Sequence, residues 1–153
     1  MRYFREIFTN YMIVSAASAW IIAQIIKVFT GMFREISFSI RTLLFSNGGM
    51  PSSHSAAVTA LATSSTILYG FNSFQCAFTS VFAIIVMMDA SGVRYETGKQ
   101  AKILNKITKE LFSGKSAEIN TGLKELVGHT PFQVFMGAIL GIAVGIGFSF
   151  FMI

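Results

Sequence analysis

The chain has 153 residues, of which 53% are hydrophobic and 12% are charged, and its mean hydropathy is +0.62. These values are far from those of an ordinary soluble domain, and the uncharged stretches approach the roughly 17–25 apolar residues that a membrane-spanning helix needs. The composition therefore favours a membrane protein over the alternative, a soluble protein with an all-apolar core. The single cysteine, Cys76, excludes an internal disulfide and a cysteine-based metal site.

In chain order, the apolar stretches predict an all-α fold: a polytopic membrane helix bundle that forms one domain over residues 1–153. We predict about four spans, with short interfacial helices between them. The second span is rich in small and hydroxylated residues, which let helices approach closely within a bilayer. The predicted spans cover residues of about 11–29, 55–70, 74–89 and 132–153.

Two segments between the spans predict interfacial helices. The apolar piece at 36–45 is too short to span and is interrupted by Arg41, so we expect it to lie at the interface. Residues 90–131 form a polar, basic loop. Within it, one helical face is apolar, and a basic amphipathic helix of this kind usually lies on an anionic membrane surface. The apolar positions are Ala101, Ile103, Leu104, Ile107, Thr108 and Leu111.

The last span carries three glycines, Gly137, Gly141 and Gly145, at intervals of four residues. Such a stripe of small residues suits close packing between helices in a bilayer. We therefore predict that this face serves helix packing and offers a surface for a homo-oligomer.

The segment at 48–55 runs into the second span and holds two glycines, a proline, three serines and a histidine. If the helix begins near Ser55, its unpaired backbone N–H groups and positive dipole end point back at Ser52 and Ser53. This arrangement predicts an anion site, with phosphate as the obvious ligand. The alternative is that the serines only cap the helix and Pro51 shapes the turn.

The topology places the polar features on one side of the membrane. With four spans, the loops 27–54 and 90–131 share a side, and the two termini lie on the other. The only two histidines, His54 and His129, each immediately precede a span on that shared side, and both are flanked by hydroxyl residues and proline. A lone histidine at a membrane boundary is more often structural, but this paired placement predicts a shared site.

Asp89 and Arg94 lie where the third span meets the polar chain. A carboxylate in mid-membrane costs about 2.5–3.5 kcal/mol on insertion scales, so an interfacial position is expected. The pair allows two interpretations: an ion pair that stabilises the helix end, or a catalytic role for Asp89.

Three motifs resemble those of the type 2 phosphatidic acid phosphatase superfamily, which includes lipid phosphatases and the vanadium haloperoxidases. The segment Pro51-Ser52-Ser53-His54 is similar to its P-S-G-H motif, Lys27 and Arg34 have the K-x6-R spacing of its first motif, and His129 is similar to its third-motif histidine. The segments 48–56, 89–94 and 128–131 together resemble the divergent branch of the superfamily, a group of small bacterial and plastid membrane proteins. The resemblance covers nearly the whole chain.

The resemblance implies a phosphohistidine mechanism. His129 is then the nucleophile and His54 the general acid, and fixed cations with helix-start N–H groups stabilise the transferred phosphoryl group. The residues implied to hold the phosphate are Lys27, Arg34, Ser52 and Ser53, with Arg94 as a candidate replacement for an arginine of the superfamily. No metal or cofactor is expected, because the chain offers no cluster of carboxylates.

Two positions depart from the superfamily pattern. Leu123 stands where the superfamily has an arginine, and Gln133 stands where it has an aspartate. The amide oxygen of Gln133 can accept from an imidazole N–H but cannot stabilise an imidazolium as a carboxylate does. Candidate replacements are Lys124 or Arg94 for the arginine, and Asp89 or Glu125 for the aspartate.

The sequence therefore predicts an integral membrane phosphatase, a metal-independent phosphoric monoester hydrolase whose substrate is a membrane lipid and not a nucleic acid. Of the twelve Lys and Arg residues, only Arg2 and Arg5 fall on the side opposite the site. The positive-inside rule then predicts a multi-pass protein of the bacterial cytoplasmic membrane with the site facing the cytoplasm, which suits phosphatidylglycerophosphate or phosphatidic acid. The alternatives are a non-catalytic lipid-phosphate or anion carrier and a purely structural membrane subunit.

Overall fold

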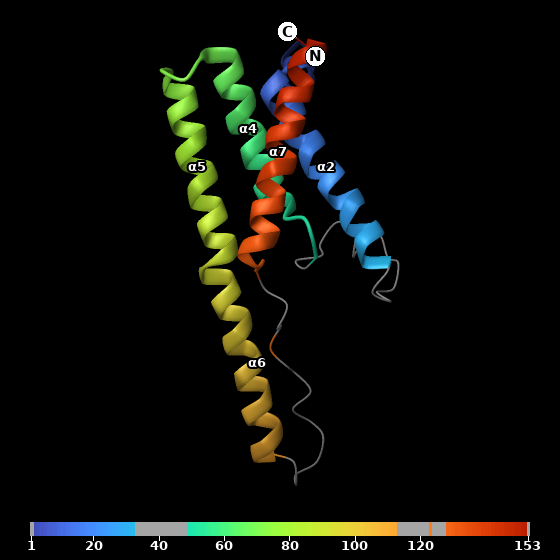
Figure 1. Cartoon of the computed structure of the whole chain (residues 1–153), viewed down its shortest axis with the longest axis vertical. Coiled ribbons are helices and arrows are strands. Elements are labelled where there is room, and N and C mark those ends of the chain that lie inside the picture. The colour runs from blue at the N-terminus through green and yellow to red at the C-terminus, as the bar shows by residue number, and fades with distance from the viewer. Residues whose placement is uncertain (1, 33–48, 113–122, 124–127, 153) are drawn as a thin grey trace.

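The computed structural model of the chain describes residues 2–32, 49–112, 123 and 128–152 (Figure 1). All regular secondary structure in this part of the chain is helical, in agreement with the predicted all-α membrane bundle. The helices are α1 (Arg2–Thr9), α2 (Tyr11–Met32), α4 (Ser53–Tyr69), α5 (Phe74–Ser91), α6 (Val93–Phe112) and α7 (Pro131–Met152). The predicted interfacial helix at 36–45 lies outside the described residues, and a single domain over the whole chain stays a prediction.

Three stretches of the described chain are long and apolar enough to cross a membrane: Tyr11–Thr30, Phe74–Leu111 and Pro131–Phe151. The predicted second span corresponds to α4, which has 17 residues and is not among them. Nevertheless, α4 is central to the bundle, since it packs against α2, α5 and α7 (Figure 1). Its many small and hydroxylated residues lower its hydropathy and at the same time allow three neighbours to approach it closely.

On one side, α4 packs against α2 through alanines that recur every fourth residue. Ala19 and Ala23 of α2 form a fully buried cluster with Ala56 and Ala60 of α4. Leu140 and Val144 of α7 pack against this cluster. Because residues four apart share a helical face, the spacing holds the two helices in close antiparallel contact.

On another side, α4 packs against the glycine stripe of α7. An added Cβ at Gly137 would meet Ser52 and Ser55, and one at Gly141 would meet Ala56 and Thr59. Gly145 likewise faces α4 and is buried. The predicted close packing is therefore present within the chain. The glycine face, which was predicted as the surface for a homo-oligomer, packs against α4 of the same chain, and the homo-oligomer itself stays a prediction.

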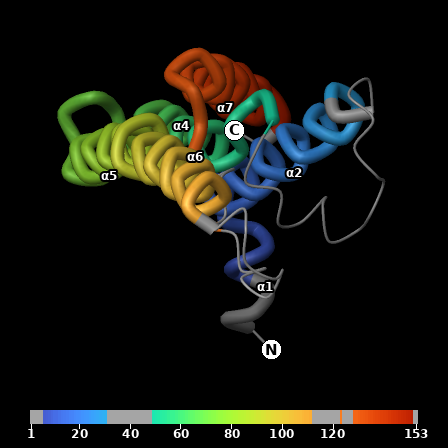
Figure 2. Tube along the Cα trace, turned by 90° about the horizontal axis from the view of Figure 1, so that it is seen from below, coloured from blue at the N-terminus to red at the C-terminus, as the bar shows by residue number. Residues whose placement is uncertain are grey.

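Gly92 alone separates α5 from α6, and α6 continues in the direction of α5 beyond the rest of the bundle (Figures 1 and 2). The N–H of Gly92 donates to the carbonyl of Met88 at 2.8 Å, and that of Glu96 donates to the carbonyl of Gly92 at 3.0 Å. The predicted break after the third span is thus a single residue. The predicted amphipathic helix is present within the polar loop, but here it extends away from the bundle instead of turning aside.

Candidate active site

The loop before α4 is attached to the end of α2. The hydroxyl of Thr30 donates to the carbonyl of Met50 at 3.1 Å, and Gly49 adopts a positive φ of 94° beside the side chain of Lys27. A left-handed backbone of this kind favours glycine, which lacks the Cβ that would be strained there. The loop therefore holds the start of α4 next to the last turns of α2.

Ser52 caps α4 and is completely buried. Its Oγ accepts from the backbone N–H of Ser55 at 3.4 Å and from the Ser55 hydroxyl at 3.0 Å. Its own N–H donates to the carbonyl of Gln133 at 3.0 Å. The capping interpretation of the sequence therefore describes Ser52 as the structure has it, and the role predicted for its side chain as a phosphate ligand stays untested.

Lys27 lies in α2 and is 8% exposed. Its Nζ donates to the hydroxyl of Ser53 at 3.3 Å. In the described part of the chain, no carboxylate lies within salt-bridge distance of this ammonium group. A buried charge without an ionic partner is costly, so this one indicates a place where an anion would be stabilised.

The segment before α7 places His129 against the junction of α5 and α6. The N–H of His129 donates to the carbonyl of Ala90 at 2.9 Å. Gly128 has a φ of 85°, and an added Cβ there would clash with the backbone of Arg94 and Tyr95. The position of the histidine backbone therefore depends on a carbonyl near the end of α5 and on a close approach to α6 that only glycine allows.

Gln133 closes a capping box at the start of α7. Its N–H donates to the hydroxyl of Thr130 at 3.3 Å, while its Oε1 accepts from the N–H of Thr130 at 3.0 Å. The intervening Pro131 occupies the first helical position, where its missing N–H is not needed. This capping box holds the side-chain amide of Gln133 next to His129, the residue before Thr130.

The same Gln133 oxygen lies 3.3 Å from Nδ1 of His129. Because this atom already accepts from the N–H of Thr130, it must be the amide oxygen, and Nδ1 of His129 must be the donor. The imidazole then carries its proton on Nδ1, which leaves the lone pair of Nε2 available for attack. Gln133 thus orients the histidine, as its amide oxygen was expected to be able to do.

The environment keeps His129 neutral. Burial lowers the pKa of His129 to about 4, the positive charge of Lys27 acts in the same direction, and the hydrogen bond to Gln133 opposes both. His129 is 5% exposed, which agrees with burial as the main cause. At neutral pH the side chain is therefore a neutral imidazole with its proton on Nδ1, the form that a nucleophile requires.

A small pocket of about 60 Å³ brings both histidines together at the end of the bundle where α6 begins. It is lined by His54, Val86, Asp89, Ala90, Arg94, Gly128 and His129. His54 is the second residue of α4 and its side chain is exposed. A cavity of this size suits a small polar group and not a whole lipid.

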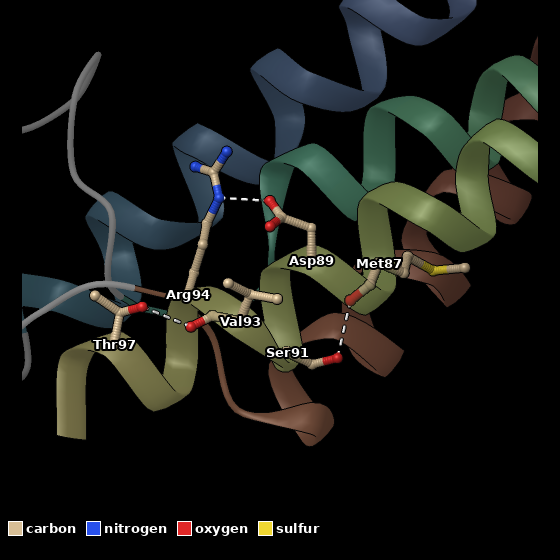
Figure 3. Close-up of polar contacts among 6 residues, drawn as sticks. All are labelled: Met87, Asp89, Ser91, Val93, Arg94 and Thr97. Atoms are coloured by element: carbon tan, nitrogen blue, oxygen red, sulfur yellow. Dashed lines mark hydrogen bonds and ion pairs between the residues drawn. The ribbon is translucent and has the colours of Figure 1, made fainter. Parts of the chain in front are cut away.

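Asp89 and Arg94 form an ion pair across the junction at Gly92, with Nε of Arg94 2.6 Å from Oδ2 of Asp89 (Figure 3). The ion pair that the sequence allowed is present, and the catalytic role for Asp89 stays a prediction. Both side chains are partly exposed, and in Figure 3 the two Nη atoms of Arg94 extend beyond the contact with Asp89. Arg94 is thus oriented by the carboxylate and still presents donors to an anion.

Two hydroxyl groups near this pair donate hydrogen bonds to backbone carbonyls of their own helices. Ser91 donates to the carbonyl of Met87 and Thr97 donates to that of Val93, both at 2.8 Å (Figure 3). Such local bonds satisfy the hydroxyl within the helix. Neither residue lines the pocket, so the polar chemistry at this junction rests on Asp89 and Arg94.

The predicted site residues come from four helices, and those that line the pocket are His54, Asp89, Arg94 and His129, whereas Lys27, Ser52 and Ser53 do not line it. Lys27 comes from α2, Ser53 and His54 from α4, Asp89 from α5 and Arg94 from α6, while His129 precedes α7. Arg34, Lys124 and Glu125 lie outside the described residues. Sequence reasoning missed the structural roles of Gly128 and Ala90; the only signal for the first was a glycine directly before the histidine. No group of three metal-binding side chains occurs among the described residues.

The helical membrane bundle, with two histidines, a buried lysine and an arginine near one end, is that of a PAP2-like membrane protein. The chain belongs to the divergent PAP2 family, whose family model matches residues 8–144. This finding confirms the resemblance seen in the sequence. The chain is also 39% identical over 158 residues to the "Uncharacterized membrane protein YuiD" of Bacillus subtilis (strain 168). That alignment covers 95% of this chain and 98% of the relative. No solved structure matches the chain.

Proposed function

We propose that this membrane protein is a metal-independent lipid-phosphate phosphatase that acts through a phosphohistidine intermediate. The observation that carries the proposal is the state of His129: its Nδ1 proton is held by Gln133, its pKa is lowered to about 4, and it shares a pocket with His54. A buried, neutral and oriented imidazole next to a second imidazole is the arrangement that nucleophilic and general-acid roles require.

The positive charges around the pocket support phosphate as the bound group. The charges of Lys27 and Arg94 both act on His129 and lower its pKa, so both lie close enough to interact with the pocket. Lys27 is buried without an ionic partner in the described chain, and Arg94 is oriented by Asp89. A phosphate monoester would bind between these cations, which would also stabilise the charge that develops on its oxygens. In this proposal, Asp89 acts by positioning Arg94.

The reaction follows from these positions. Nε2 of His129 attacks phosphorus, the bond from phosphorus to the lipid alcohol oxygen breaks, and protonated His54 donates a proton to that oxygen. A water molecule then attacks the phosphohistidine, with His54 accepting its proton, and the N–P bond breaks to release inorganic phosphate. His54 lies at the start of α4 with its side chain exposed, where it can exchange protons with water.

The substrate and the location of the site belong to the same proposal. A 60 Å³ pocket accommodates a small group while the apolar remainder of the substrate stays in the bilayer, which favours a phospholipid monophosphate such as phosphatidic acid or phosphatidylglycerophosphate. The excess of Lys and Arg on the side of the site supports a cytoplasmic orientation in a bacterial cytoplasmic membrane.

Phosphate release by purified protein tests the proposal directly. In detergent with EDTA present, we expect release from phospholipid monophosphates by the wild type. Conversion of Lys27 to glutamine should lower the release strongly, because the buried cation is lost while the length of the side chain is nearly kept. No release from any substrate, with phospholipid binding intact, would overturn the enzyme and support a carrier. The amide at Gln133, in place of a carboxylate, is the observation that favours a carrier.

Replacement of Gln133 by glutamate should move the acid limb of the pH–rate profile to higher pH. His129 acts in its neutral form, so activity is lost as the pH falls through its pKa, which is about 4 in the wild type. A carboxylate beside the ring favours the imidazolium and raises that pKa, so the loss begins at a higher pH.

The measurement is the rate of phosphate release from acid to neutral pH. Gln133→Leu is the control, because it removes the acceptor and should lower the rate at every pH through loss of the oriented tautomer. An acid limb for Gln133→Glu at or below that of the wild type would contradict the assigned role of Gln133.

A further inference from the structure

Helix α6 has an apolar face that no other described element covers. The helix has 20 residues, so it extends for about 30 Å. It packs chiefly against α5 at its start and then continues beyond the bundle (Figure 1). Its exposed apolar side chains are Val93, Ile103, Leu104, Ile107 and Leu111, which are 45–73% exposed. Val93, Leu104, Ile107 and Leu111 follow one another at intervals of 11, 3 and 4 residues, which place them on one helical face. Ile103 lies beside that face.

The opposite side of α6 is basic. Lys99, Lys102, Lys106 and Lys109 recur every three or four residues and therefore form a second face. Lys99 pairs with Glu96 at 2.8 Å and Lys106 with Glu110 at 3.9 Å, and all four lysines are exposed. The helix thus separates apolar and cationic side chains onto different sides.

An anionic lipid surface matches both faces of this helix. Its acyl region accepts the apolar side chains, and its negatively charged headgroups attract the lysines across the width of the helix, which is about one Debye length. A second copy of α6 could cover the apolar face, but it carries the same excess of positive charge and would bring no negative surface to the lysines. The helix also begins at the end of the bundle, where a membrane surface would lie, because Arg94 in its first turn lines the pocket there.

The junction with α5 permits the required change of direction. Gly92 is not helical, and the carbonyl of Ala90 accepts from the N–H of His129, where an uninterrupted helix would use the N–H of Arg94. The hydrogen bond that an uninterrupted helix would form at the Ala90 carbonyl is therefore replaced by one to the segment that carries His129. Breaks of this kind in the hydrogen-bond ladder, and glycines, are the usual places where helices bend.

We propose that α6 binds the anionic surface of the membrane in which the bundle sits, with its apolar face inserted among the lipids and its lysines on the opposite, water-facing side of the helix, where the negative charge of the headgroups still attracts them. Bending at Gly92 brings α6 from the line of α5 onto that surface. This interaction does not depend on catalysis, so it is tested independently of the proposed phosphatase activity.

Spin labels on the two faces of α6 test the proposal. In a Cys76→Ala background, one variant carries the label at Leu104 and its matched control carries it at Lys102, on the opposite side of the helix. Each is placed in nanodiscs of phosphatidylcholine alone or of equal parts phosphatidylcholine and phosphatidylglycerol. Collision with a water-soluble nickel complex reports exposure to water, and collision with oxygen reports insertion into lipid.

We expect the nickel accessibility at Leu104 to fall several-fold in the anionic discs, while that at Lys102 changes little. Replacing all four lysines by glutamine should remove the dependence on lipid charge. Equal exposure of Leu104 to water in both lipids would overturn the proposal. Protection of Leu104 only in discs that hold two copies would also overturn it, and would identify a second copy as the partner.

Discussion

Conversion of His129 to alanine should lower hydrolysis of every phosphate monoester by roughly three orders of magnitude or more, because the proposed nucleophile that forms the covalent intermediate is lost. Conversion of His54 to alanine should have a different signature. Loss of a general acid lowers the rate of the first step, in which an alkyl phosphate phosphorylates His129, by about 10²–10⁴-fold, but matters far less for that step with an aryl phosphate, whose leaving group departs without a proton. The contrast separates the two roles that the shared pocket indicates.

The comparison needs both variants, one lipid phosphate and one aryl phosphate, with each protein shown to elute as the wild type does from a sizing column. A phosphoryl label trapped on the His54→Ala variant should be labile in acid and stable in base, as expected for a bond from nitrogen to phosphorus. Hydrolysis by His129→Ala at the wild-type rate would remove His129 from the mechanism. Equal losses in the first-turnover release of the alcohol from both esters by His54→Ala would contradict its role as the acid.

Replacement of Gly128 by alanine should lower activity by about 100-fold, although residue 128 needs no side-chain chemistry. An added Cβ clashes with the backbone of Arg94 and Tyr95, so either the loop or α6 must shift. The next residue is His129, whose backbone is hydrogen-bonded to Ala90. A displacement of about 1 Å at a reacting group can cost on the order of 10²-fold in rate.

Gly70 provides the matched control, because its φ of 82° is close to the 85° of Gly128 and an added Cβ there meets nothing within 4 Å. Alanine at either position suffers the cost of the left-handed backbone, but only Gly128→Ala also displaces the site. Activity and the midpoint of thermal unfolding are measured for both variants. Similar activity losses in the two would show that backbone strain alone, and not the contact with α6, explains the effect.

The positions of the membrane helices were readable from the sequence because a bilayer imposes a local requirement, a long apolar run, on each one separately. The capping chemistry was readable for the same reason. Ser52 before Ser55, and Thr130 before Gln133, satisfy helix-start groups three residues away. Alternation of sides along the chain then placed His54 and His129 together without any knowledge of packing.

Contacts between distant segments could not be read in this way. The hydrogen bond from His129 to Ala90 joins residues 39 positions apart, and the approach of Gly128 to α6 depends on how three helices meet. The glycine stripe shows the same limit, because its spacing predicts a close helix contact but not whether the partner is α4 or a second chain.

The sequence by itself determined an all-α membrane protein of the divergent PAP2 family, with its polar groups on one side, since apolar length, caps and motif spacing are local properties. Tertiary structure alone decided that Lys27 is buried beside Ser53, that Arg94 pairs with Asp89 next to the histidines, and that α6 leaves the bundle in line with α5. The physical reason is that burial, charge proximity and helix direction arise from packing between segments, and one amino-acid sequence does not specify the distances between those segments.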